Sequence, residues 1–239
     1  MTLTTSVSEQ AAAPIASLVG RRLARRDALS VAPGIVPFGT VLGVTIVVVG
    51  ADRLAGLVGA VAVYAGSAQL SAVSLLDKGL GVLAVTLTAA VVNVRLLLYS
   101  AALGERFRRQ RGLFRWLGPH FIIDQTYLMA SAREDLDDDT FRTYWLWLGG
   151  TILVVWTSSI ALGVLLGPAL PDLPHLPLVG TTLFVGMLAP RLVTRPAVVV
   201  AAAAGLTAGL VSQVAPALGI VAGAVAGVLA ALSFGGSRD

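Results

Sequence analysis

The sequence predicts an all-α protein that crosses a membrane several times. Of its 239 residues, 56% are hydrophobic and 13% are charged, whereas soluble domains carry roughly 25% charged residues. The mean hydropathy is +0.85. Uncharged stretches cover residues 28–51, 54–76, 143–171 and 196–237, and each is longer than the about 20 apolar residues that a crossing helix needs. With shorter apolar segments included, we expect about six to eight membrane segments, some of them broken or re-entrant.

Residues 1–26 are expected to form a disordered cytoplasmic tail. The first twenty residues contain no long apolar run, and the basic residues follow them and precede the first span: Arg21, Arg22, Arg25 and Arg26. A cleaved signal peptide has the opposite order. Residues 27–235 then form a single transmembrane domain.

The first three apolar segments cover about residues 27–50, 54–76 and 80–104. The first contains Pro33, Gly34, Pro37 and Gly39, and because proline removes a helical hydrogen bond, we expect this helix to be broken there. The second is expected to be one span with Gly66 and Gln69 near its middle. The third carries Asn93 and Arg95 at membrane depth.

Residues 105–142 form a basic and acidic connector that we place in the cytoplasm. Five arginines lie between Arg106 and Arg115, and arginines beside a span mark its cytoplasmic end. Residues 117–132 are apolar but short, which favours a re-entrant or tilted helix, and residues 133–142 are acidic. Since both arginine groups belong in the cytoplasm, one of the three segments between them must be broken or re-entrant, or the charge rule fails here.

The rest of the chain is expected to form a long helix over residues 144–167, a proline-rich turn over 168–177 and segments at 178–188, 197–214 and 217–234. Two of the three tryptophans in the long helix are placed to anchor it at the interface. The last two segments form a hairpin whose tip is Ala215 and Pro216. Their glycines recur every four residues, a pattern that lets helices approach closely, and packing within the chain is favoured over docking of a second subunit.

Polar residues at membrane depth are the candidates for function, since they cost free energy there. Arg95 could clamp a carboxylate or form a structural ion pair with Asp124 or Asp27. Asp124, in an apolar context, could carry a proton, cap a helix or pair with Arg95. Gln69 could line a pocket with Gly66 or make an interhelical hydrogen bond. The predicted break at Pro33–Gly39 would free backbone groups that can bind charges.

Other function classes find little support. The chain has no cysteine, no HExxH, no GxSxG elbow and no GxxxxGK[ST] phosphate loop, so we expect no enzyme, no metal site and no cofactor. The arginines cluster at the ends of apolar segments and not on one polar face, which disfavours nucleic-acid binding.

Four ordered motifs resemble one known family. They are VPFGTVLG at residues 36–43, YAGSAQL at 64–70, NVRLLLYS at 93–100 and DQTY at 124–127. They are similar to the successive signatures of the AzlC family, the large subunit of branched-chain amino acid exporters. The resemblance is strong over residues 26–133 and is one of pattern in the remainder.

The resemblance implies a permease of the bacterial inner membrane that exports valine, leucine, isoleucine and also methionine with a small membrane partner of the AzlD type. It draws attention to the expected substrate-binding residues, which are Pro37, Gly39, Gly66, Gln69, Asn93 and Arg95, and to Asp124. Relatives often have histidine and glutamate where this chain has Leu96 and Gln125, so a proton path through those side chains is absent here.

Two further readings stay open. In one, the chain is a structural or assembly subunit whose glycines and Arg95 serve packing while a partner transports. In the other, it is a channel or a permease that depends on an ATPase.

Overall fold

The structure, a computed structural model, describes residues 3–169, 192–215 and 218–235, and every regular element in these ranges is a helix. The predicted all-α class is confirmed. Four helices in this part of the chain are long and apolar enough to cross a membrane: α1 (Leu3–Val48), α4 (Val82–Arg109), α7 (Asp138–Leu166) and α9 (Arg195–Val214). The predicted segment at 178–188 lies outside the described residues, as does most of the proline-rich turn.

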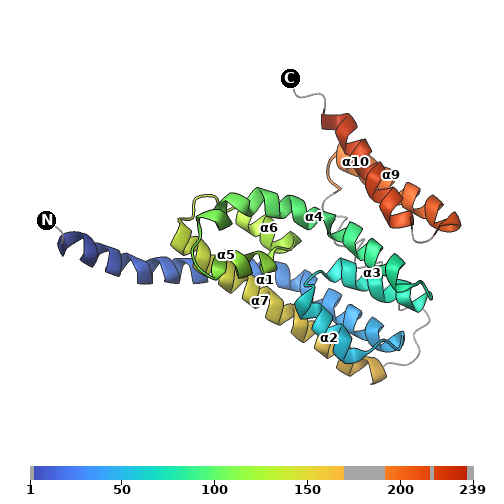
Figure 1. The fold of residues 1–239 in the computed structure, drawn as a ribbon, viewed down its shortest axis with the longest axis horizontal. Coiled ribbons are helices and arrows are strands. Elements are labelled where there is room, and N and C mark those ends of the chain that lie inside the picture. Colours follow the sequence, from blue (N-terminus) through green and yellow to red (C-terminus); the bar gives the residue numbers. More distant parts are fainter. Residues whose placement is uncertain (1–2, 170–191, 216–217, 236–239) are drawn as a thin grey trace.

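Helices α1 and α7 form the centre of the fold and run in the same direction (Figure 1). Glycines let them approach closely. A Cβ on Gly20 would lie 2.8 Å from the carbonyl oxygen of Thr140, and one on Gly43 would lie 2.9 Å from Cα of Gly163. Such contacts are those of small residues at helix crossings in membranes. Here the glycine pattern serves packing within the chain, as expected.

Helix α1 also includes residues 3–26, where we expected a disordered tail, and Ala24 in this stretch is buried. The helix is continuous through Pro33 and Pro37, so the predicted break is wrong. The reason is α7: a proline in a membrane helix is tolerated where a neighbouring helix packs against it, and the side chain of Pro37 is exposed on the other side.

The break lies instead in the second apolar segment, which was expected to be one span. It forms two short helices, α2 (Arg53–Ala62) and α3 (Gly66–Asp77), of 10 and 12 residues. At 1.5 Å per residue each is about 15–18 Å long, roughly half of a bilayer core of about 30 Å. Tyr64 between them has a φ of 48°, a left-handed conformation that is uncommon for a residue with a side chain.

Helices α2 and α3 form an antiparallel hairpin whose tip reaches the middle of the molecule. Nε2 of Gln69 on α3 donates to the carbonyl oxygen of Gly56 on α2 at 2.6 Å. Near its start, α2 contacts Ile46 at the end of α1 through Gly56, whereas Gly66 beyond the tip contacts Phe38, which lies ten residues before the end of α1. Both outer ends of the hairpin therefore lie near the end of α1, and the hairpin does not cross the molecule.

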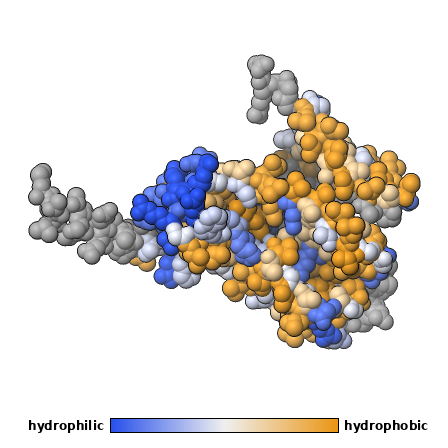
Figure 2. Space-filling model, in the orientation of Figure 1, coloured by the Kyte–Doolittle hydropathy of each residue, from blue (hydrophilic) through white to orange (hydrophobic). Residues whose placement is uncertain are grey.

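This hairpin explains how the two arginine groups can lie together. Helix α1 leads from one end of the molecule to the other, the hairpin enters the molecule and leaves it at that same end, and α4 leads back. The end of α4 meets the start of α7, where Arg109 pairs with Asp138 at 3.5 Å. We call this the basic end, comprising residues 21–26, 105–115 and 133–140. Figure 2 shows hydrophilic surface gathered there while most of the remaining visible face is hydrophobic. One of the first three segments is broken, as expected, and it is the second and not the first.

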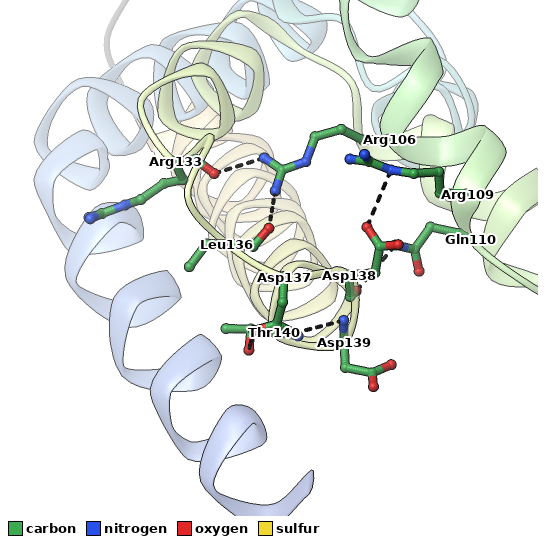
Figure 3. Close-up of polar contacts among 9 residues, drawn as sticks. All are labelled: Arg106, Arg109, Gln110, Arg133, Leu136, Asp137, Asp138, Asp139 and Thr140. Atoms are coloured by element: carbon green, nitrogen blue, oxygen red, sulfur yellow. Dashed lines mark hydrogen bonds and ion pairs between the residues drawn. The ribbon is translucent and has the colours of Figure 1, made fainter. Parts of the chain in front are cut away.

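Polar contacts hold the basic end together (Figure 3). Arg106 on α4 donates to the carbonyl oxygens of Arg133 at 2.8 Å and Leu136 at 2.7 Å, and its guanidinium lies 4.1 Å from the ring centroid of Phe141. The side chain of Asp137 accepts from the backbone N–H of Thr140 at 2.9 Å and caps α7. The acidic loop thus starts α7 six residues earlier than the sequence suggested.

Residues 117–132 are two short helical pieces and not the single helix that we expected. A 3-10 helix, η1 (Gly118–Phe121), follows the four-residue α5 (Phe114–Leu117), and after an extended Ile122 and Ile123 comes α6 (Asp124–Ser131). The ring nitrogen Nε2 of His120 lies 3.0 Å from the carbonyl oxygen of Val61. The interruption before α6 therefore lies beside the tip of the α2–α3 hairpin.

The last two described helices, α9 and α10 (Gly219–Gly235), form the predicted hairpin. Built Cβ atoms on Gly219 and Gly223 of α10 would meet the backbone of Ala208 and Ala204 on α9 at 2.9 and 2.7 Å, so the glycine spacing serves contact within the hairpin. Figure 1 shows the hairpin beside α4, with which α10 makes contact. Of the three tryptophans on α7, only Trp147 is exposed, which leaves one candidate anchor and not two.

Candidate functional site

A cavity of roughly 250 Å³ lies where the two interrupted segments meet the middle of the long helices. Five elements contribute to it: α1, the tip of the α2–α3 hairpin, α4, the start of α6, and α7. Its size is just below the about 300–1,000 Å³ of small-molecule sites. The cavity is therefore suited to a small solute.

A charged pair forms one wall of the cavity. Nη2 of Arg95 on α4 lies 2.9 Å from Oδ2 of Asp124, the first residue of α6. The same Nη2 donates to Oγ of Ser67 at 2.6 Å, and the hydroxyl of Tyr99 donates to Oδ1 of Asp124 at 2.9 Å. The two charged side chains keep 39% and 29% of their surface exposed. Arg95 and Asp124 are thus paired but not sealed.

The guanidinium of Arg95 is not fully satisfied by these contacts. Its Nε is shielded and has no hydrogen-bond partner among the described residues. Most buried polar groups in proteins do have partners, so an incompletely bonded group at a cavity is a reason to look for a ligand.

Another part of the lining is apolar and little exposed. Four of its side chains are nearly inaccessible, with 2–8% of their surface exposed: Ile35, Phe38, Ile152 and Trp156. The rings of Phe38 and Trp156 lie 5.6 Å apart between centroids at an angle of 33°. Exposure therefore falls from the charged pair to the aromatic pair, and we interpret the charged pair as the polar mouth of the cavity and the aromatic pair as its apolar inner end.

The helix that starts at the cavity adds backbone donors. The first turn of α3 begins at Gly66, and its N-cap residue Ala65 makes no capping hydrogen bond through its side chain. The first N–H groups of a helix have no partner within the helix and attract negative charge. The start of α3 thus adds partial positive charge next to Arg95.

Three residues singled out from the sequence line this cavity: Gly66, Arg95 and Asp124. Of the two ion pairs considered for Arg95, the structure has the one with Asp124. The two positions at which the chain departs from its relatives, Leu96 and Gln125, also line the cavity.

Four other expected substrate-binding residues do not line it. Pro37 is exposed on α1, and Gly39 packs on α7, where a Cβ would lie 2.8 Å from Cβ of Ser159. Gln69 joins the two arms of the hairpin. Asn93 on α4 has a shielded Oδ1 without a partner among the described residues. Gly39 and Gln69 serve packing, and nothing in the structure explains Pro37 or Asn93.

Asp27 lies in a separate cluster at the basic end, so the alternative that it pairs with Arg95 is wrong. Its carboxylate accepts from Nη2 of Arg133 at 2.9 Å and from the hydroxyl of Tyr144 at 2.7 Å. The hydrogen bond to Asp27 raises the pKa of Arg133 above its ordinary value. This buried cluster ties α1 to α7 and to the loop that precedes it.

Sequence reasoning missed most of the apolar wall. Ile152 and Trp156 lie more than fifty residues beyond Arg95 in the chain, and no motif in the sequence links them to it. Tyr64 lines the cavity from the hairpin tip, and no proline marks the turn there. The one available signal was Gly66, because a Cβ on it would lie only 2.6 Å from Cη2 of Trp156.

Comparison with known proteins supplies the family. The family model AzlC, described as AzlC protein, matches residues 30–170, which include every residue that lines the cavity. No curated protein and no solved structure matches the chain. Since the family model covers more than half of the sequence, the chain belongs to the AzlC family, and its role is related to the transport of branched-chain amino acids.

Proposed function

We propose that the chain is the large subunit of a secondary transporter that exports valine, leucine, isoleucine and methionine across the bacterial inner membrane with a small partner of the AzlD type. The central cavity is the substrate site, with Arg95 and Asp124 as its charged ligands. The observation that carries this proposal is one pair of opposite charges in a cavity that is also lined by buried aliphatic and aromatic side chains.

The chemistry of the cavity complements an aliphatic amino acid. The guanidinium of Arg95 offers paired donors for a carboxylate, and the carboxylate of Asp124 accepts from an ammonium group. The apolar inner end receives the side chain. Because a zwitterion carries both charges, it can replace the internal pair with two new pairs and leave no charge unpaired.

The exposure of the pair makes this exchange feasible. Breaking a buried ion pair costs about 3–5 kcal/mol, whereas an exposed pair contributes only about 0–1 kcal/mol. With 39% and 29% of their side-chain surfaces exposed, Arg95 and Asp124 are closer to the second case. Substrate can therefore separate them at modest cost, while Ser67 and Tyr99 keep each side chain oriented.

The hairpin and the start of α6 give the site its means of changing shape. Broken helices that meet at mid-membrane are the usual setting of substrate sites in secondary transporters. Here α2–α3 brings its tip to the cavity from one side, and the charged pair joins α4 to α6. Separation of Arg95 from Asp124 on binding would loosen α4 from α6 and couple occupancy to movement.

An efflux assay tests this function. Cells are loaded with a dipeptide of isoleucine or valine, and efflux of the free amino acid is measured with this chain, with its small partner, with both and with neither. We expect rapid efflux only with both. The same cells carry Arg95→Ala, Asp124→Asn and, as a control with an equal charge change, Arg115→Ala, whose side chain is exposed at the basic end.

We expect Arg95→Ala and Asp124→Asn to reduce efflux at least tenfold with normal membrane insertion, and Arg115→Ala to leave it unchanged. Equal efflux in all four cell types would favour the assembly subunit. Wild-type efflux that persists in Arg95→Ala would remove the cavity from the proposal. Efflux that continues unchanged after collapse of the ion gradients would indicate a channel.

A further inference from the structure

The inner end of the cavity is formed by two aromatic side chains from different helices, Phe38 on α1 and Trp156 on α7. We propose that Trp156, supported by Phe38, sets the upper limit on the size of the amino acid side chain that is exported. This inference rests on the proposed function, because it assumes that substrate occupies the cavity.

The orientation of the substrate follows from where the charges lie. Arg95 and Asp124 are the partly exposed groups, whereas Phe38 and Trp156 are 8% and 5% exposed. A bound zwitterion keeps its two charged groups on that pair at the mouth. Its side chain must then point toward the closed end, where it meets the rings.

The indole of Trp156 is held in place by two glycines. On one side, a Cβ on Gly39 would lie 3.3 Å from Cε3 of Trp156. On the other, a Cβ on Gly66 would lie 2.6 Å from Cη2 of Trp156 and 2.7 Å from Cε1 of Phe38. The ring therefore fills the space that a side chain at either glycine would need. The six-membered ring is thus packed against both glycines, and we treat the indole as a fixed wall.

A fixed wall excludes by size. Interiors are packed closely enough that an added group must displace its neighbours. A branched aliphatic side chain can lie against the indole edge, but an aromatic side chain would have to displace it. The six-membered ring of the indole, which contacts Gly66 at the cavity, is the part that a smaller residue would vacate.

Trp156→Phe tests this limit with little damage to the fold. Nε1 of Trp156 has no hydrogen-bond partner among the described residues, so phenylalanine removes no hydrogen bond and keeps an aromatic ring against Phe38. The assay uses the full chain with its small partner in cells loaded with a leucine–phenylalanine dipeptide. It measures the ratio of phenylalanine efflux to leucine efflux.

We expect that ratio to rise at least about tenfold in Trp156→Phe, since a change of about one methylene in a pocket alters discrimination by roughly 10–200-fold. The matched control is Trp147→Phe, the same substitution on the exposed side of the same helix, which should leave the ratio at the wild-type value. Phe38→Leu is read alongside and should raise the ratio in the same direction, which keeps the test valid if Trp156→Phe fails to insert.

The outcomes separate the two proposals. Absence of leucine efflux from the wild type would overturn the proposed function itself. Wild-type leucine efflux together with an unchanged ratio in both Trp156→Phe and Phe38→Leu would overturn only the size limit. An equal rise in Trp147→Phe would do the same, because it would assign the effect to a general loosening of α7.

Discussion

Asp27 and Asp124 should differ in how the same substitution affects stability and transport. Replacing each with asparagine keeps the size and removes the charge. We expect Asp27→Asn to destabilise the protein with transport selectivity unchanged, and Asp124→Asn to abolish transport with stability nearly unchanged.

The magnitudes follow from burial and from the number of partners. Asp27 is 7% exposed and accepts from both Arg133 and Tyr144, and a hydrogen bond to a charged group is worth about 1.5–3 kcal/mol. Asparagine retains one acceptor, so we expect a loss of about 2 kcal/mol. The side chain of Asp124 is 29% exposed, as part of a pair whose other member is 39% exposed, so its loss should cost less than about 1 kcal/mol.

Thermal unfolding of the purified protein in detergent measures the first effect and amino acid efflux measures the second. A loss of about 2 kcal/mol corresponds to a fall of roughly 4–8 °C in the midpoint for a chain of this size. The control is Glu105→Gln, an exposed carboxylate paired with Arg108, for which both readouts should match the wild type. Equal destabilisation by Asp27→Asn and Asp124→Asn would refute the distinction between a structural and an exchangeable pair.

Two further predictions concern α7 and the hairpin. The hydrogen bond from the backbone of Thr140 holds the pKa of Asp137 below its ordinary 3.8, so its contribution is present above that value and is lost as the pH falls through the lower, folded-state pKa. Acidification below about pH 4 should therefore cost the wild type up to about 1 kcal/mol of unfolding free energy, and Asp137→Asn, which caps without titrating, should lack this part of the acid response. Because the chain has no cysteine, Arg53→Cys and Lys78→Cys should react with a membrane-impermeant maleimide from the same side, and Arg111→Cys from the other. Labelling of Arg53→Cys and Lys78→Cys from opposite sides would show that the second segment crosses the membrane.

The sequence was sufficient for the fold class and for the approximate positions of the four long apolar helices α1, α4, α7 and α9, because length and composition alone decide whether a helix can cross. The charges at both ends of the first three segments also indicated that one of them is broken or re-entrant, unless the charge rule fails here. These inferences depend on local composition, which a sequence displays directly.

The position of the break could not be read in the same way. Pro33 and Pro37 are strong local signals, yet packing against α7 keeps α1 helical through them. Tyr64 carries no such signal, and its left-handed conformation follows from contacts made by the whole hairpin. Tertiary packing overruled local preference in both places.

The same distinction between local signals and tertiary packing applies to the residues of the site. Arg95 and Asp124 were visible because a charge in an apolar segment needs an explanation, and their spacing did not exclude a pair. The partner of Asp27 was not visible, since Arg133 lies in a polar loop where an arginine is unremarkable. The aromatic wall was hidden for the opposite reason, because Phe38 and Trp156 are ordinary residues for membrane helices.

The left-handed turn at Tyr64 also affects how this protein should be studied by mutagenesis. The turn leads directly into the first turn of α3, whose backbone N–H groups have no partner within the helix. Replacing side chains one by one leaves these amides in place, so an alanine scan would register the side chains of Arg95 and Ser67 and overlook the main-chain donors. Exchange of single backbone amides for esters in this turn would reveal a contribution that conventional scanning cannot detect.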